Sequence, residues 1–298
     1  MAVPLEIACD ESGSEGEKVV GGTTRMFAHA SVDIDTALAA DCIVELRGRT
    51  RSPAEEYKAS VVLRTQNRSA LVWLLGDGGP LAGRAHVHLV EKQAYAVREL
   101  VALVGGPAPL ADALHREAAE EVGGAAWTGL LSAFNDLMRA RGRVDVELMG
   151  AAFLRRVDAL PGGGAVGALA GLVRDVDQEA LLGPLTDTAR MTPRLQPLVP
   201  ALVAAVRHWG RGGRPVLLVH DQQQALTSRR VAHVRELLVE QGDGAGPLVD
   251  VRLVDSRADS RVQVADLLAG AARRIAEDRL DGHGDDALRG LLAPYADG

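Results

Sequence analysis

The stretch from Leu5 to Gly13, LEIACDESG, decides the predicted fold. Every second residue from Leu5 to Cys9 is apolar, and this period of two is typical of a β-strand that ends at Asp10. A glycine-containing loop follows, and residues 26–32 are predicted to return as a hairpin-like second strand. Asp10 and Glu11 would then lie at the edge of a sheet, where open α/β proteins place their chemistry. The alternative is a turn with solvated acids, since Asp, Ser and Gly are ordinary turn residues.

The rest of the chain alternates between segments with strand periodicity and segments with helical periodicity. Short apolar runs between turn residues predict further strands at 85–90, 215–221 and 249–254. Helical spacing predicts helices at 35–46, 67–76, 93–104, 166–182, 195–210, 226–240 and 262–278. Residues 47–56 are predicted as a loop, while 57–63 fits either a short strand or the start of a helix. Strands that alternate with helices around a mixed sheet define the α/β class.

One segment departs from this alternation. Residues 107–164 are rich in Ala and Leu at helical spacing and end in the run Pro161-Gly-Gly-Gly164. We interpret 107–164 as a helical insertion, joined through Gly162–Gly164 to a core of residues 1–106 and 165–298. Its arginines, which we regard as a candidate substrate or partner surface, are Arg139, Arg141, Arg143, Arg155 and Arg156.

Composition excludes several classes of protein. The 298 residues are 47% hydrophobic, which is ample for a buried core and excludes a wholly disordered chain. Two cysteines, Cys9 and Cys42, are too few for a disulfide scaffold and indicate reduced thiols. There is no apolar run of the ~18–20 residues that a membrane span needs, so a cytoplasmic protein without a membrane partner is expected. The net charge of −7 argues against indiscriminate coating of nucleic acid but permits a local basic groove.

Two further acids occupy positions comparable to that of Asp10. Asp221 ends the apolar run 215–221, and its carboxylate would face Asp10 if the two strands were near neighbours. Asp266 follows Gln263 by three residues in the first turns of the last predicted helix, so both project from one face. Each acid also has a purely structural explanation, because Asp favours helix caps and first helical turns.

Glu56 and Lys58 form a fourth candidate. A carboxylate and an ammonium two residues apart on an extended chain point to the same side, and such a pair can hold a metal or steady a leaving phosphate. Arg47, Arg49 and Arg51 alternate just upstream and either grip phosphates or form a solvated basic loop.

His86 and His88 share one strand face, as two zinc ligands could. A zinc site needs three or four ligands, and the sequence shows no clear partner set. An ordinary polar face is therefore the favoured interpretation of this pair.

The order of these motifs resembles a known family. Asp10 to Gly13, Glu56 with Lys58, His220-Asp221, and Ser256 before Gln263-Val-Ala-Asp266 resemble the motifs of the domain-of-unknown-function 3800 family. The resemblance covers most of the chain apart from about 107–164. It implies a ribonuclease H-like fold and an activity presumed to be that of a nuclease. The Glu-x-Lys element also fits restriction-endonuclease-like enzymes, whose strand order does not suit a chain that opens with the Asp10 strand.

We therefore expect a divalent-metal-dependent nuclease with a ribonuclease H-like mixed central sheet. Asp10, Asp221 and Asp266 are the expected ligands of Mg²⁺ or Mn²⁺, with Glu11 and Glu56 as additional ligands. Lys58 would help electrostatically at the phosphate, and Ser256 and Gln263 would support the ligands. The expected partner is DNA or RNA, and the oligomeric state is left open, with a homodimer among the alternatives. Two other classes stay open: a non-catalytic scaffold that binds nucleic acid or a partner, and an enzyme acting on a small phosphorylated metabolite.

Overall fold

The computed structural model describes residues 3–50, 59–186, 195–240, 242, 244 and 246–296. The chain divides into two compact units. The first, here called the sheet unit, is built from Met1–Ser14, Met26–Leu89 and Leu198–Gly298. The second, the helical unit, is built from Glu15–Arg25 and Val90–Pro197.

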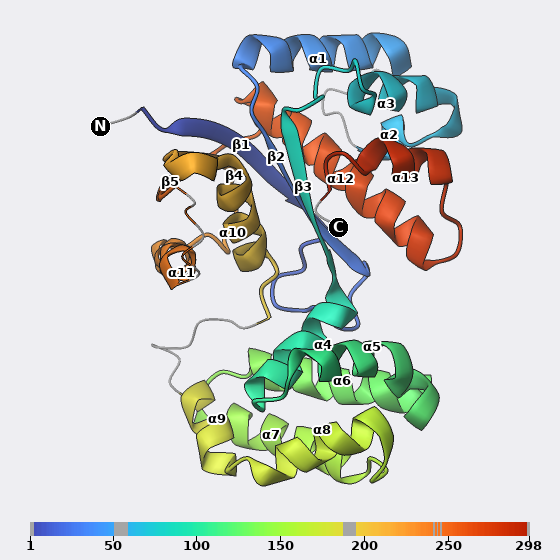
Figure 1. The fold of residues 1–298 in the computed structure, drawn as a ribbon, viewed down its shortest axis with the longest axis vertical. Coiled ribbons are helices and arrows are strands. Elements are labelled where there is room, and N and C mark those ends of the chain that lie inside the picture. The colour runs from blue at the N-terminus through green and yellow to red at the C-terminus, as the bar shows by residue number, and fades with distance from the viewer. Residues whose placement is uncertain are drawn as a thin grey trace. The chain divides into compact units, whose positions relative to one another are not determined.

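The sheet unit contains an open, mixed five-stranded sheet (Figure 1). Its strands are β1 (Leu5–Ser12), β2 (Met26–Val32), β3 (Ala85–Glu91), β4 (Val216–Asp221) and β5 (Leu248–Val254). They lie in the order β3-β2-β1-β4-β5. β1 pairs antiparallel with β2 and parallel with β4, and β4 pairs parallel with β5. The predicted α/β class and the predicted strands are therefore confirmed.

β1 is the central strand and is covered on both faces. Ile7, Ala8 and Cys9 are fully buried, so the polar face that a period-two pattern implies is reduced to the exposed Glu6. Glu6 pairs with Arg252 of β5 and with Arg261. Gly13 follows β1 with φ of 83°, a conformation that L side chains rarely adopt. The predicted strand end at Asp10 is two residues too early, because β1 continues to Ser12 before Gly13 turns the chain.

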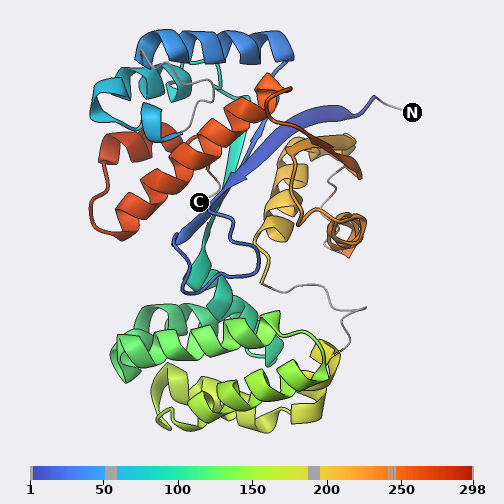
Figure 2. The same cartoon turned by 180° about the vertical axis from the view of Figure 1, so that it is seen from behind.

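Helices cover both faces of the sheet (Figures 1 and 2). On one side lie α1 (Thr36–Thr50), α3 (Arg68–Leu75), α12 (Ser260–Leu280) and α13 (Asp286–Leu292), with the short α2 (Ala59–Val62) against α12. On the other side lie α10 (Leu198–Trp209) and α11 (Ser228–Glu240). α12 contacts β1 and β2 along its length, so it is the helix that builds the core of this unit.

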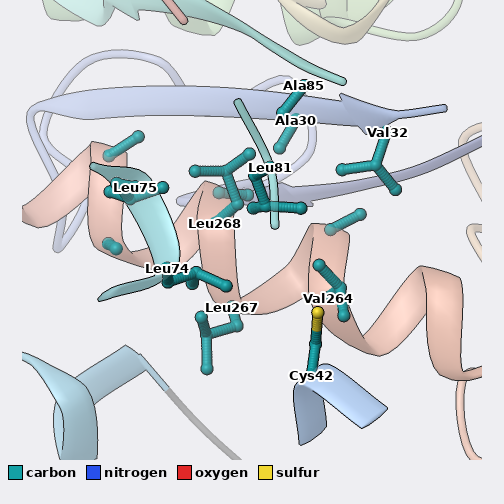
Figure 3. Close-up of a cluster of buried hydrophobic side chains, with 14 of the residues drawn as sticks. Ala30, Val32, Cys42, Leu74, Leu75, Leu81, Ala85, Val264, Leu267 and Leu268 are labelled. Carbon is teal, nitrogen blue, oxygen red and sulfur yellow. The ribbon is translucent and has the colours of Figure 1, made fainter. Parts of the chain in front are cut away.

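The main core lies between α12, the sheet, α1 and α3. Leu268 of α12 is directed toward the strands beside Ala30, and Val264 lies near Cys42 of α1 (Figure 3). Both α12 side chains are fully buried, which stabilises the fold by about 1.5–3 kcal/mol for each. Cys9 and Cys42 are both buried and free.

The helical unit contains six helices among the described residues. They are α4 (Lys92–Leu103), α5 (Ala108–Val122), α6 (Gly124–Arg139), α7 (Arg143–Asp158), α8 (Gly164–Asp175) and α9 (Gln178–Thr186). Trp127, Phe134 and Phe153 are buried, and the two Phe ring centroids lie 6.0 Å apart. Asn135 of α6 binds the segment Glu15–Arg25, because its Oδ1 accepts from the backbone N–H groups of Val19 and Val20.

The predicted helical character of 107–164 is confirmed, but the predicted boundaries are wrong. α4, α8, α9 and the segment Glu15–Arg25 also belong to the helical unit, because α5 packs on both α4 and α8 and Asn135 holds the segment. Gly162–Gly164 therefore lies inside this unit, between α7 and α8, and does not join it to the sheet unit.

Three local predictions also differ from the structure. Residues 47–50 continue α1, because Arg49 pairs with Glu45 one turn earlier at 2.7 Å and lies over the Trp73 ring. The predicted helix 166–182 is divided into α8 and α9, and α13 was not anticipated. Within the described ranges, none of the helices combines the length and apolar character that a membrane crossing requires.

Candidate functional site

The register of β1 and β4 brings the predicted acids to one end of the sheet. These parallel strands are neighbours, and Cys9 pairs with His220. Ala8 and Val219 belong to the core beneath α12, and side chains alternate between faces. Asp10 and Asp221 therefore project toward α12, while Glu11 and His220 project toward the face that α10 covers.

Asp10 is the most perturbed acid of this group. Only 8% of the residue is exposed, and its Oδ1 accepts from the Glu11 backbone N–H at 2.7 Å. Burial raises the pKa of Asp10 to about 8, and the negative charges of Glu11, Asp266 and Asp221 contribute to the increase. Three further acids thus act on Asp10 near the end of β1.

Asp221 is oriented by the turn that follows β5. Its Oδ1 accepts from the backbone N–H of Ser256 at 3.0 Å. The side-chain amide of Gln263 in turn donates to the carbonyl of Ser256 at 2.9 Å. Ser256 and Gln263 therefore support Asp221 in series, and Ser256 does so through its main chain.

Asp266 is positioned by the first turns of α12. The helix begins at Ser260, and the side chain of its N-cap, Asp259, accepts from the Arg261 backbone N–H at 3.0 Å. Hydrogen bonds from Arg261 lower the pKa of Asp259 against the opposing effect of burial. The capping acid of this helix is thus Asp259, so the helix-capping explanation does not account for Asp266.

Glu11 and His220 form a close pair that the sequence did not single out. His220 Nε2 lies 3.3 Å from Glu11 Oε2, and the Gln223 amide donates to the other Glu11 oxygen. One ligand atom each of Asp10, Glu11 and His220 lies within 4.8 Å of the others, an arrangement that could hold a metal ion. The sequence held one indication of this pair. His220 directly precedes Asp221, and Glu11 directly follows Asp10, so both side chains must face away from the two aspartates.

Histidines gather on this same face of the sheet. The rings of His29 and His220 are stacked with centroids 5.4 Å apart, and those of His86 and His208 with centroids 4.3 Å apart. Burial, with the neighbouring histidines His220, His88 and His86, lowers the pKa of His29 well below its ordinary value. His29 is therefore neutral at pH 7. The sequence indicated only His86 and His88 on a shared strand face, whereas His29, His208 and His220 also lie at the α10 face of the sheet.

The other predicted site residues lie on α1 or outside the described residues. Glu56, Lys58 and Arg51 lie outside the described residues. Arg47 and Arg49 lie in the last turn of α1 and not in the predicted loop, and residues two apart on a helix do not face each other. Phosphate binding by them stays a prediction.

The arginines proposed as a substrate surface belong to the helical unit, and several are paired. Arg141 binds Glu17 of the segment Glu15–Arg25. Arg143 pairs with Glu147 at 2.8 Å. Part of this positive charge therefore serves contacts within the helical unit.

No protein-family model, curated protein or solved structure matches this chain. The geometry of the site therefore carries the functional argument.

Proposed function

We propose that the protein is a divalent-metal-dependent phosphodiester hydrolase, a nuclease, built on a ribonuclease H-like core. The observation that carries the proposal is Asp10, a buried carboxyl whose pKa is raised to about 8 by burial and by three neighbouring acids. The mixed sheet and the resemblance to the domain-of-unknown-function 3800 family support the same conclusion.

The residues fit a hard divalent cation. Several carboxylates cannot all stay ionised at one buried point unless a cation lies among them. Asp10, Asp221 and Asp266 would hold Mg²⁺ or Mn²⁺, which favour oxygen ligands, and Glu11 would add a further carboxylate. When bound, such an ion activates a water and stabilises the charge on a leaving oxygen.

The chain itself would supply orientation and a proton change. Asp10 would release its proton when a cation is bound, because the cation offsets the neighbouring negative charges. The Ser256 N–H would keep one Asp221 oxygen in place, and Gln263 would keep Ser256 in place. Such supporting contacts typically change metal affinity 10–100-fold when they are removed.

A basic pocket next to Ser12 supports a phosphorylated substrate. It lies between α2 and α12 and is lined by Arg64, Arg273 and Arg274 together with Ala59, Ser60, Leu63 and Gly270. Arg273 donates from Nε to the Ser12 hydroxyl at 3.0 Å, two residues beyond Asp10 on β1. Arg273 and Arg274 also pair with Glu277 and Asp278, so a phosphate would use the guanidinium N–H groups that these pairs leave available.

A second candidate function is hydrolysis of a small phosphorylated metabolite. The observation that favours it is the pocket itself, which three arginines line. The two candidates share the carboxylate cluster and differ in the size of the substrate.

The decisive experiment is a cleavage assay. Single- and double-stranded DNA and RNA, and in parallel a small phosphodiester, are incubated with the protein in Mg²⁺ or Mn²⁺ beside the Asp10→Asn variant. Cleavage that requires both the metal and Asp10 supports the proposal, and cleavage of only the small ester favours the second function. Failure to cleave any of them with a folded, metal-loaded protein would favour a non-catalytic scaffold.

A further inference from the structure

We propose that Glu11 and His220, with Asp10, form a ligand set for a transition-metal ion that binds imidazole nitrogen, represented by Zn²⁺. The inference rests on the metal centre of the proposed function but not on hydrolysis. It extends that centre to the α10 face of the sheet and to a class of ion that carboxylates alone would not select.

The neighbours of His220 select its tautomer when the ring is neutral. Its Nδ1 lies 3.1 Å from the backbone carbonyl oxygen of Asp221, which can only accept a hydrogen bond. In a neutral ring Nδ1 therefore carries the hydrogen, and Nε2 presents a lone pair. A backbone carbonyl that fixes the tautomer in this way is the usual companion of a metal-binding histidine.

The lone pair of His220 faces another acceptor. Nε2 lies 3.3 Å from Oε2 of Glu11, and neither atom has a hydrogen-bond partner among the described residues. The side chain of His220 is 0% exposed and that of Glu11 is 9% exposed, so bulk water does not supply the missing hydrogen bonds. Two buried acceptors that face each other are unfavourable unless a proton or a metal ion lies between them.

The orientation of Glu11 favours the metal. The Gln223 amide occupies Oε1, which leaves Oε2 directed to His220. An oxygen of Asp10 is a third ligand atom within 4.8 Å of those of Glu11 and His220. A shared proton would need only two partners.

The donor set indicates the class of ion. One imidazole and two carboxylates suit Zn²⁺ and related transition metals, whereas Mg²⁺ prefers oxygen ligands and retained waters. The carboxylates without His220 would favour Mg²⁺ or Mn²⁺.

The test is calorimetric titration of the full chain with Zn²⁺ and, separately, with Mg²⁺. Wild-type protein should bind one Zn²⁺ that His220→Gln weakens by at least about tenfold, with a smaller effect on Mg²⁺. Glu11→Gln should act in the same direction. The matched control is His233→Gln on α11, which removes a surface histidine 3.4 Å from Glu236 and should leave this Zn²⁺ site unchanged.

A second measurement does not depend on a variant folding. In the wild-type protein, the imidazole ¹⁵N resonance of His220 Nε2 should shift when Zn²⁺ is added, while Nδ1 keeps its hydrogen. An unchanged Nε2 resonance, or an imidazolium signature in the metal-free protein at pH 7, would overturn the inference. So would Zn²⁺ binding that His233→Gln weakens and His220→Gln does not.

The outcomes separate this inference from the proposed function. Zn²⁺ bound through His220 without any cleavage would sustain the metal site and count against the nuclease. Cleavage in Mg²⁺ that needs Asp10, with no Zn²⁺ at His220, would sustain the nuclease and overturn the metal site.

Discussion

Ser256 donates its backbone N–H to Oδ1 of Asp221 at 3.0 Å. The turn after β5 thus orients a carboxylate at the end of β4, and Gln263 of α12 orients the turn. The contact joins β4 to the turn between β5 and α12, and it does not use the side chain of Ser256.

Replacing Ser256 should separate main-chain from side-chain effects. Ser256 follows Asp255 in a turn closed by the Ala258 N–H to the Asp255 carbonyl, a position that accepts proline. Ser256→Pro removes the N–H and should weaken metal binding about 10–100-fold. Ser256→Ala keeps the N–H and should bind nearly as the parent does. Calorimetry with Mn²⁺ compares them, and equal losses in both variants would refute a main-chain role.

Asp10 should make the stability of the metal-free protein depend on pH. Its pKa is about 8 when folded, against an ordinary value of 3.8, so between about pH 4 and pH 8 the folded state holds a proton that the unfolded state has released. The free energy of unfolding should therefore fall as the pH rises through this window, by up to about 1.4 kcal/mol per pH unit.

The Asp10→Asn variant should lack this slope. Denaturant unfolding in a metal chelator at pH 5 and pH 8 measures the difference between the two proteins. Parallel pH profiles would show that Asp10 does not hold a proton in the folded state.

Gly270 should resist replacement by alanine. A Cβ at this position of α12 would lie 2.6 Å from the Cβ of Ala59, closer than such atoms approach. Gly270→Ala should destabilise the protein despite the gain of about 1 kcal/mol that alanine gives in a helix. Gly171→Ala in α8 meets no atom within 4 Å and should be neutral or stabilising. Thermal unfolding of both variants provides the comparison, and a stabilised Gly270→Ala would contradict the packing.

Asn135 should matter more than the ion pair beside it. Its Oδ1 accepts from the N–H groups of Val19 and Val20, and its Nδ2 donates to the Glu17 carbonyl. Asn135→Ala would leave these groups without partners, at a cost of about 1–3 kcal/mol for each one that stays buried. Arg141→Ala breaks a partly exposed pair with Glu17 and should cost under about 1 kcal/mol. Denaturant unfolding gives the ranking, and the reverse order would be evidence against this role of Asn135.

Much of the fold could be predicted from local patterns. The strand at Leu5–Ser12 and the run Val216–Asp221 carry strong periodicity or a continuous apolar run between turn residues. Element ends were less predictable. Arg49 continues α1 because it pairs with Glu45 and lies over Trp73, and the ring contact is absent from any local pattern.

The unit boundary depended on contacts between distant residues. Composition distinguishes residues 107–164 from the rest of the chain. The helical unit is larger and also contains the segment Glu15–Arg25. Asn135 holds that segment from more than one hundred residues away in sequence. No composition of the segment itself could indicate this contact.

The sequence by itself determined that Asp10 and Asp221 lie late in two strands and that Asp266 lies in the early turns of a helix, because strand and helix periodicity is local. It could not determine which of them meet. The parallel pairing of β1 with β4 decided that Asp10 and Asp221 share one face, and that Glu11 meets His220 on the other. The physical reason is that pairing register and burial are properties of distant segments brought together, and they alone set the distances and the dielectric surroundings on which charge and metal binding depend.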